Sequence, residues 1–341
     1  MAAAAKSVNL LVCAGSETPE LEVLKRLPPG VRVVATGQTL SDLGQQLPSD
    51  DDWAAIDAMV ICGVGKNAGK RDEIRAFWHK LTGLRWLHSS SAGLEHLLFP
   101  ELVEGDVALT NAKGVYSHSL AEYALTCCSY FAKDFPRLLA AKAAARWEPY
   151  DVEELRGKTL GVVGYGDIGR ATAVLAKAFR MRVVALRRNT TLSAEEQAEG
   201  VVERMYSPAQ LPELMAASDY VVVATPHTPA TDKLVSAAAI AAMKPTGVLV
   251  NVGRGKCVDE EALIEALRAR RIRGAALDVF ATEPLPPESP LWGLDNVFMS
   301  PHNADRTKEF QFESLELFLQ NMARYIAGDA LLNVCDKRAG Y

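Results

Sequence analysis

Short apolar runs alternate with longer amphipathic segments along most of this chain of 341 residues. Runs rich in Val, Ile, Leu and Ala are typical of strands buried in a parallel sheet, and helical segments separate them. The first series of predicted strands covers 9–14, 31–35, 58–62 and 86–89, with a helix over 70–80. The second series covers 159–163, 182–186, 220–224, 247–251, 274–277 and 297–299. The pattern predicts an α/β protein with two doubly wound sheets, of which the second has six strands.

Two apolar helical segments mark where the chain passes from one series to the other. Residues 119–131 lie between the two series, and residues 308–327 follow the last strand with apolar side chains at helical spacing. The chain is longer than a usual single domain of roughly 100 to 200 residues. We therefore expect a discontinuous domain from residues 1–118 and 305–341, and a continuous one from residues 119–304.

Composition narrows the class of partner. The chain is 49% apolar and 23% charged with a net charge of -5, which is typical of soluble globular proteins. It has no block of Lys and Arg that would attract nucleic acid or anionic lipid. No apolar run reaches the roughly 18 residues or more that span a bilayer. We expect a small-molecule partner, and neither nucleic acid nor a membrane.

The cysteines show no metal-binding or disulfide pattern. Six occur without a C-x-x-C pair, at Cys13, Cys62, Cys127, Cys128, Cys257 and Cys335. We expect reduced, mostly buried thiols and no metal site. Such usage fits a reducing compartment, either the cytoplasm or an organelle stroma reached with a transit peptide that is then removed.

A glycine-rich motif directly follows the predicted strand 159–163. It reads Gly164-Tyr165-Gly166-Asp167-Ile168-Gly169 and opens a predicted helix. In such a motif the first glycine permits a tight turn, the second lets a pyrophosphate approach the backbone, and the third allows close packing of helix on strand. The N–H groups at the helix N-terminus then attract the phosphates. We predict a dinucleotide-binding site here.

The residues after the next strand indicate which dinucleotide is preferred. An acidic residue at this place would accept hydrogen bonds from the ribose 2′-hydroxyl of NAD. This chain has Arg187 and Arg188 instead, and guanidinium groups pair well with phosphate. We expect a preference for NADP(H), with NAD(H) as the alternative if the two arginines are simply solvated.

Arg254, Glu283 and His302 each follow one of the last three predicted strands. Ligands of open α/β sheets bind outside the carboxyl ends of the strands, so these side chains can converge. A histidine suits proton donation to a developing alkoxide near neutral pH, and a neighbouring carboxylate keeps it charged. An arginine can hold a substrate carboxylate and polarise its carbonyl. The set predicts hydride transfer to a keto acid with His302 as general acid.

Together these segments resemble the D-isomer-specific 2-hydroxyacid dehydrogenase family over nearly the whole chain. The stretch from Arg156 to Gly169 is similar to the family's cofactor signature, and Arg254, Glu283 and His302 match its catalytic set in order and rough spacing. The resemblance implies two Rossmann-like domains of the formate/glycerate dehydrogenase type, with the active site in the interdomain cleft. It also implies a homodimer built through the nucleotide-binding domains.

The same resemblance implies roles for further residues. Ser91, Ala92 and Gly93 would bind the substrate together with Arg254 and His302. The nicotinamide side would be lined by Thr225, Pro226, Val252, Gly253, Asp278 and Asn303. The implied reaction is NAD(P)H-dependent reduction of pyruvate, glyoxylate or hydroxypyruvate to the D-2-hydroxy acid, as in D-lactate dehydrogenase, glyoxylate reductase and hydroxypyruvate reductase. Loops near 63–66 and 89–94 would form the pocket wall and choose among these substrates.

Two other functions share this fold. A nucleotide-sensing scaffold similar to the C-terminal-binding-protein corepressors keeps the same three residue types, but this sequence shows no long disordered extension. A formate dehydrogenase-like enzyme lacks the Glu partner of the histidine, which Glu283 provides here. The 2-keto acid reductase is therefore the first hypothesis, and the scaffold is its alternative.

Overall fold

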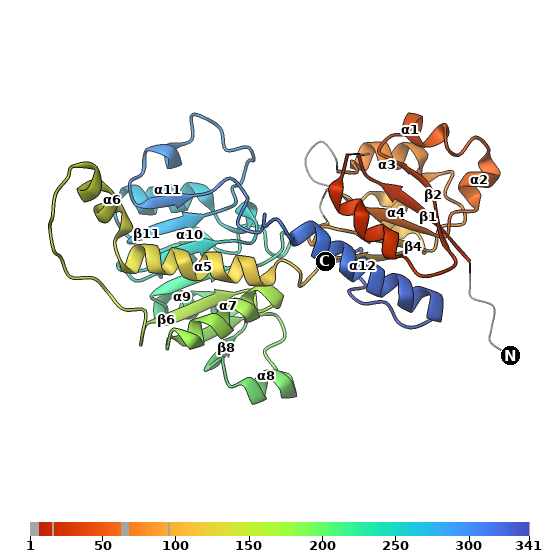
Figure 1. Ribbon diagram of the computed structural model, residues 1–341. Coiled ribbons are helices and arrows are strands. Elements are labelled where there is room, and N and C mark those ends of the chain that lie inside the picture. Colours follow the sequence, from red (N-terminus) through yellow and green to blue (C-terminus); the bar gives the residue numbers. More distant parts are fainter. Residues whose placement is uncertain (1–6, 16, 63–67, 95, 341) are drawn as a thin grey trace. The chain divides into compact units, whose positions relative to one another are not determined.

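The structure is a computed structural model that describes residues 7–15, 17–62, 68–94 and 96–340. It divides into two compact units (Figure 1). Unit 1 consists of Met1–Tyr116 and Thr307–Tyr341, and unit 2 consists of Ser117–Arg306. The chain passes from one unit to the other at two points, and each point lies two residues from the boundary expected from the sequence. The loop at 63–66, expected to form part of the pocket wall, lies outside the described residues.

Unit 1 contains a five-stranded parallel sheet with the strand order β2-β1-β3-β4-β5. Its strands are β1 Val8–Cys13, β2 Val31–Gly37, β3 Ala58–Ile61, β4 Trp86–Ser89 and β5 Ala108–Asn111. The sequence does not predict β5, because its four residues end in Thr110 and Asn111 and form no apolar run. Pairing with β4 places β5 in the sheet.

The helices of unit 1 come from both ends of the chain. They are η1 Pro19–Arg26, α1 Leu40–Gly44, α2 Asp50–Ala54, α3 Arg71–Trp78, α4 Pro100–Glu104 and α12 Phe310–Ala327. Leu315, Phe318 and Met322 of α12 are buried in one core with side chains of β1. Phe318 stacks on Trp86 of β4 with ring centroids 5.3 Å apart. The predicted helix at 308–327 thus packs on the sheet of unit 1 through its apolar face.

Unit 2 contains a seven-stranded parallel sheet with the order β12-β11-β10-β9-β6-β7-β8. Its strands are β6 Thr159–Val163, β7 Arg182–Leu186, β8 Arg204–Tyr206, β9 Tyr220–Val223, β10 Val248–Asn251, β11 Gly274–Leu277 and β12 Val297–Met299. The expectation of six strands is wrong by one. The additional strand, β8, has three residues with Arg204 exposed, and it pairs at the edge with β7. An edge strand of this length contains no apolar run from which the sequence could predict it.

Helices cover both faces of this sheet. They are α5 Ser117–Ala132, α6 Phe135–Ala143, α7 Asp167–Ala178, α8 Ala194–Glu199, η3 Pro208–Gln210, α9 Leu211–Ala217, α10 Ala237–Ala241, η4 Gly255–Cys257, α11 Glu260–Arg268 and η5 Pro290–Gly293. Helices α9, α10 and α11 share a core with one face of the sheet. Helices α5 and α7 lie side by side on the other face (Figure 1). The chain turns back at β6 and β9, so the carboxyl ends of these strands form a switch point where ligands of such sheets bind.

The helices and the cysteines can be compared with what the sequence predicts about membranes and disulfides. Among the described residues, none of the helices combines the length and the apolar character needed to cross a bilayer. The six cysteines are free thiols, five of them buried and Cys335 partly buried.

Candidate active site

The glycine motif has the shape that a dinucleotide requires. Gly164 has φ +101°, and a Cβ there would lie 2.9 Å from the carbonyl oxygen of Ala224. A Cβ at Gly169 would lie 2.1 Å from the carbonyl oxygen of Gly164. At Gly166, by contrast, a Cβ would meet no heavy atom of the described residues within 4 Å. The first and third glycines are therefore required by the protein itself, while the second borders open space where a pyrophosphate can approach the backbone.

The surroundings of this turn also fit a bound dinucleotide. Helix α7 begins at Asp167 after Gly166, which has no side chain to cap the first N–H groups, so these favour an anion. Thr225, after β9, is buried beside Gly164, and its hydroxyl has no hydrogen-bond partner among the described residues. A Cβ at Gly253 would lie 2.7 Å from the carbonyl oxygen of Thr225, so the turns after β9 and β10 touch.

The remaining residues of the expected cofactor site differ in exposure. Tyr165 and Val252 are buried, Ile168 is partly buried, and Pro226 and Asn303 are exposed. Asp278 is buried, and its carboxylate accepts a hydrogen bond from the N–H of Asn303.

Arg187, expected to bind a 2′-phosphate, is held within the protein. Its Nη1 and Nη2 atoms donate to the two carboxylate oxygens of Glu196 on α8, at 2.6 and 2.8 Å. The same side chain donates to the carbonyl oxygens of Asn189 and Thr191, each at 2.6 Å. The hydrogen bond from Arg187 is the main reason that the pKa of Glu196 is lowered to about 2. The next residue, Arg188, is exposed.

His302 and Glu283 form a direct pair beyond the carboxyl ends of β11 and β12. Nδ1 of His302 lies 2.7 Å from Oε2 of Glu283, and Oε1 of Glu283 accepts from the N–H of Phe280 at 2.9 Å. The hydrogen bond to Glu283 raises the pKa of His302 against the effect of burial. Burial acts to raise the pKa of Glu283, but its hydrogen bonds to His302 and Phe280 lower the pKa overall. Both effects favour the imidazolium–carboxylate form.

Arg254 lies close enough for its charge to act on this pair. It follows β10, and its Nη1 donates to the carbonyl oxygen of Gly253 at 2.8 Å. A Cβ at Gly255 would lie 2.0 Å from the carbonyl oxygen of Phe280, so the segments after β10 and β11 are in backbone contact. The positive charge of Arg254 lowers the pKa of Glu283 and opposes the rise in the pKa of His302. The three predicted side chains thus gather at one edge of the unit 2 sheet.

The backbone at His302 is held in an unusual conformation. His302 has φ +49°, in the left-handed region that costs energy for a residue with a side chain. Its N–H donates to the carbonyl oxygen of Asp278 at 2.8 Å. The carboxylate of Asp278 accepts from the N–H groups of Asn303 and Ala304 at 3.0 and 3.2 Å. Asp278 therefore fixes the segment that carries His302.

Four side chains at this site are not predicted by the sequence. The hydroxyl of Tyr123 on α5 lies 2.5 Å from the hydroxyl of Ser300, which donates to Asp278 at 2.6 Å. The hydroxyl of Ser119, also on α5, donates to the carbonyl oxygen of Ala304 at 2.7 Å. Asp305 lies near His302, and burial raises the pKa of its carboxyl. Tyr123 and Ser300 are 177 positions apart, so no motif links them.

In unit 1, the loop expected to bind the substrate carboxylate follows β4. The carbonyl oxygen of Ser91 accepts from the N–H of Ala112 at 3.3 Å, and that of Ala92 accepts from the side chain of Asn111 at 2.6 Å. Ser91, Ala92 and Gly93 are all partly buried. The two carbonyl bonds anchor this loop to the last residue of β5 and to the residue after it.

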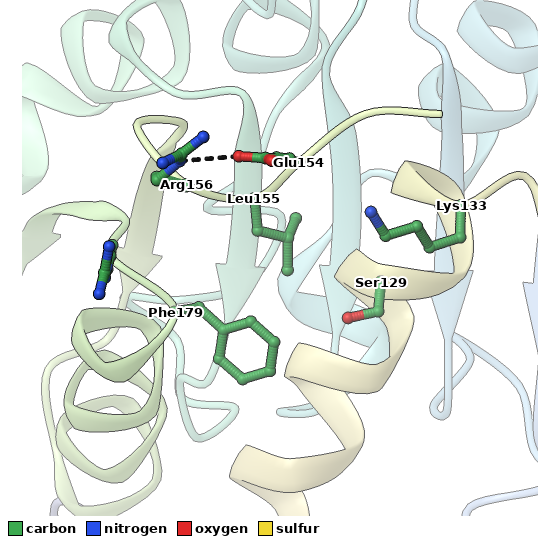
Figure 2. A pocket seen from close by; sticks show the side chains of 7 residues that line it. Ser129, Lys133, Glu154, Leu155, Arg156 and Phe179 are labelled. Atoms are coloured by element: carbon green, nitrogen blue, oxygen red, sulfur yellow. Dashed lines mark hydrogen bonds and ion pairs between the residues drawn. The ribbon is translucent and has the colours of Figure 1, made fainter. Parts of the chain in front are cut away.

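A separate hollow of about 380 Å³ lies elsewhere in unit 2 (Figure 2). Its lining comes from the ends of α5 and α7 and the chain before β6, and consists of Ser129, Lys133, Glu154, Leu155, Arg156, Phe179 and Arg180. It contains no residue of the predicted site. Arg156 pairs with Glu154 at 2.7 Å, and the carboxyl ends of two helices disfavour an anion there. The hollow shows no chemistry that belongs to the His302 site.

A doubly wound sheet with an open glycine turn at its switch point and a charged histidine–glutamate pair nearby defines a dinucleotide-dependent oxidoreductase. A family model described as "D-isomer specific 2-hydroxyacid dehydrogenase, NAD binding domain" matches residues 125–304. The chain belongs to the D-isomer specific 2-hydroxyacid dehydrogenase family and is a nicotinamide-dinucleotide-dependent enzyme. This confirms the resemblance, the fold class and the enzyme class expected from the sequence.

Individual proteins show the extent of the similarity. A glyoxylate reductase of Thermofilum pendens is 34% identical over 262 residues, which cover 73% of this chain and 75% of that protein. A D-isomer specific 2-hydroxyacid dehydrogenase from Xanthobacter autotrophicus Py2, solved with NADPH and MES, has a TM-score of 0.80 and 27% identity over 98% of this chain and 100% of that chain. An NADPH-dependent glyoxylate/hydroxypyruvate reductase from Sinorhizobium meliloti, solved with NADP and sulfate, gives the same TM-score, identity and coverage.

Proposed function

We propose that the protein reduces glyoxylate, hydroxypyruvate or pyruvate to the corresponding 2-hydroxy acid, of D configuration where the carbon is chiral, and prefers NADPH to NADH. The observation that carries this proposal is the 2.7 Å contact between Nδ1 of His302 and Glu283 next to the charge of Arg254. Similarity to a glyoxylate reductase and to a glyoxylate/hydroxypyruvate reductase with bound NADP supports the substrate class and the cofactor.

The side chains of the site divide the work of ketone reduction. When bound, the reduced nicotinamide supplies a hydride for the carbonyl carbon. His302 donates the proton from Nε2 to the carbonyl oxygen, because Glu283 occupies Nδ1 and keeps the ring charged. Arg254 binds the substrate carboxylate and polarises the carbonyl. In this proposal the backbone N–H groups of Ala92 and Gly93 also receive the carboxylate.

The cofactor residues follow from the same proposal. The turn from Gly164 to Gly169 binds the pyrophosphate at the N-terminus of α7. The nicotinamide half is bound beside the turns after β9, β10 and β12, which present Thr225, Pro226, Val252, Gly253 and Asn303. The buried hydroxyl of Thr225, which has no hydrogen-bond partner in the described part of the chain, supports this placement.

Replacing His302 with Ala tests the proposed acid. We expect kcat to fall by about 10² to 10⁴-fold, because that is the usual contribution of a positioned general acid. Binding of NADPH, followed by fluorescence titration, should stay nearly unchanged, because His302 is not assigned to cofactor binding. The matched control is His79→Ala, which removes an exposed histidine at the end of α3 and should leave kcat intact. Equal loss of turnover and NADPH binding would contradict the assigned role.

Steady-state rates distinguish among the three substrates, and they distinguish a keto acid reductase from a nucleotide-sensing protein. Glyoxylate, hydroxypyruvate and pyruvate are each assayed with NADPH and with NADH. Turnover of at least one keto acid, faster with NADPH, is the expected result. Tight binding of NADPH without turnover of any of the three would favour a nucleotide-sensing role instead.

We propose that the active protein is a homodimer built through unit 2. Helix α6 has no buried residue. Leu139 on this helix is 62% exposed, and Trp147 in the chain after it is 95% exposed. A helix without a buried residue and large apolar side chains exposed on it and after it are typical of an interaction site. A second copy of the chain would cover them.

A further inference from the structure

We propose that Asn111 and Asn333 are positioning residues, which together direct the N–H groups of Ala92 and Gly93 toward the substrate carboxylate. Asn333 belongs to the C-terminal segment, so the last residues of the chain contribute to substrate binding. This inference rests on the proposed reduction of a keto acid. It adds to that proposal two side chains of unit 1 that orient the substrate loop, residues 90–93.

The carbonyl groups of the substrate loop point toward the end of β5. The carbonyl oxygen of Ser91 accepts from the N–H of Ala112 at 3.3 Å, and that of Ala92 accepts from Nδ2 of Asn111 at 2.6 Å. Both peptide bonds are trans, and the C=O and N–H of a trans peptide lie in one plane and point in opposite directions. The N–H groups that share these peptides belong to Ala92 and Gly93. Because their carbonyl groups are turned toward β5, these two N–H groups are turned away from it.

The same two N–H groups are available to a ligand. Neither has a hydrogen-bond acceptor in the described part of the chain, whereas the N–H of Ser91 donates to the hydroxyl of Ser89 at 3.3 Å. Ala92 and Gly93 are partly buried, and a buried N–H without a partner costs free energy that a bound carboxylate would recover. Adjacent backbone N–H groups that point to one side form a concave site for an anion. The loop therefore offers two oriented donors to a carboxylate.

The side chain of Asn111 can hold this loop in one orientation only. It is 4% exposed. Its Oδ1 accepts from the N–H of Lys113 at 3.2 Å, while its Nδ2 donates to the carbonyl oxygen of Ala92. If the amide were turned over, its oxygen would face the Ala92 carbonyl and its NH2 group would face the Lys113 N–H, so both bonds would be lost. The backbone after β5 thus fixes the donor that holds Ala92.

The C-terminal segment after α12 holds Asn111 from the edge of β5 that β4 leaves open. The N–H of Asn111 donates to the carbonyl oxygen of Asn333 at 3.4 Å. Nδ2 of Asn333 donates to the carbonyl oxygens of Asn111 and Lys113, at 3.3 and 2.7 Å. The N–H of Cys335 donates to the carbonyl oxygen of Leu109 at 2.8 Å. Asn333 has φ +54°, in the left-handed region that asparagine tolerates better than most residues.

The start of the substrate loop is fixed by other groups. The carbonyl oxygen of Ser90 accepts from the hydroxyl of Ser314 on α12 at 2.9 Å and from the hydroxyl of Tyr116. Because these bonds do not involve Asn111, its loss should free the turn at 91–93 and leave the beginning of the loop in place. Substrate binding should then change while the fold is kept.

Steady-state kinetics and oxalate binding test the inference in the full-length protein. Asn111→Leu keeps a side chain of similar shape, removes the donor and adds no charge. The KM for the keto acid that is reduced fastest should rise by about tenfold with kcat nearly unchanged, because bonds to the carboxylate act in the ground state and the transition state alike. The dissociation constant of oxalate from the NADPH complex, which probes carboxylate binding without turnover, should rise by a similar factor. That of NADPH should stay unchanged.

Two further variants complete the experiment. Asn333→Gly keeps the left-handed backbone and removes the amide, so it should act in the same direction as Asn111→Leu with a smaller effect. Thr110→Val is the matched control, because it removes a buried hydroxyl of β5 that bonds to Trp86 and His88 and not to the loop. It should lower the Tm and leave the KM and the oxalate affinity unchanged.

Three outcomes would overturn the inference. An unchanged KM and oxalate affinity in either Asn111→Leu or Asn333→Gly would mean that the altered side chain only stabilises the fold. An equal loss of NADPH and oxalate affinity would mean that the whole site is disturbed. An equal rise of the KM in Thr110→Val would assign the effect to lost stability. Absence of turnover in the unaltered protein would refute the proposed reduction instead, whereas the oxalate results bear on this inference alone.

Discussion

Two histidines of this chain show how surroundings decide what a residue does. His88 is fully buried, its Nδ1 bonds to the hydroxyl of Thr110 at 2.8 Å, and burial lowers its pKa to about 3. His302 is partly exposed, and its hydrogen bond to Glu283 raises its pKa. The first is neutral and packs the core, whereas the second carries the proton that the proposed reaction needs.

Replacing Glu283 with Gln should shift the pH dependence of reduction. In the proposed mechanism, the rate of keto acid reduction depends on protonated His302, so it falls as pH rises through the pKa of this residue. Glu283 raises that pKa, chiefly by its hydrogen bond. In Glu283→Gln the alkaline limb of kcat/KM against pH should therefore move to lower pH. Arg254 and Asp305 remain in the variant and are common to both profiles.

The control for this profile is Glu288→Gln, which changes an exposed glutamate in the same loop. Its alkaline limb should coincide with that of the unaltered protein. An unshifted limb in Glu283→Gln would mean that Glu283 does not set the pKa of His302.

The pair of His302 and Glu283 also stabilises the folded protein, and it does so over a defined range of pH. Because the pKa of His302 is raised above 6.5, its contribution is fully present below that value and is lost as pH rises through the folded pKa. Because the pKa of Glu283 is lowered below 4.5, its contribution is present above that value and is lost as pH falls through the folded pKa. Solvent screening keeps both contributions small, since the two side chains are 43% and 34% exposed.

Helix α5 supports the segment that carries His302 through side chains that have no role of their own in the proposed reaction. Tyr123 bonds to Ser300, Ser300 bonds to Asp278, and Asp278 accepts from the backbone after His302. Since His302 sits at a positive φ, this chain of bonds keeps a costly conformation in place. Tyr123 is therefore a positioning residue.

Tyr123→Phe should lower kcat while leaving the KM for NADPH unchanged. The lost hydrogen bond is worth about 1 kcal/mol, which corresponds to roughly a fivefold change in rate if it acts only in the transition state. Ser300→Ala should have a larger effect, because it also removes the bond to Asp278. The alkaline limb should shift in both variants, which loss of stability alone would not produce.

Tyr130→Phe is the matched control, because Tyr130 lies on the same helix and packs on Phe298 with ring centroids 4.7 Å apart. It should leave kcat unchanged. If Tyr123→Phe loses Tm but keeps its kcat and pH profile, Tyr123 has only a structural role.

At the scale of the whole molecule, the proposed homodimer accounts for the exposed apolar side chains of α6 and the following chain. Leu139→Glu combined with Trp147→Ser should shift the protein from dimer to monomer, because a charge and a polar group would enter the interface. Analytical ultracentrifugation measures this directly. Val33→Glu is the control, since Val33 is an exposed apolar residue of unit 1 and should not alter the mass. A monomeric unaltered protein would refute the proposed dimer.

Local patterns in the sequence predict the α/β class, ten of the strands, the glycine turn and the three polar residues beyond the last strands. These features are local, because apolar runs, glycines and residues at strand ends can be recognised from near neighbours in the chain. Folding brings about the pairing of the edge strands β5 and β8, the ion pair between Arg187 and Glu196, and the hydrogen bond between Tyr123 and Ser300. Those features depend on which of several available partners a side chain or strand meets after folding, and no local pattern specifies that choice.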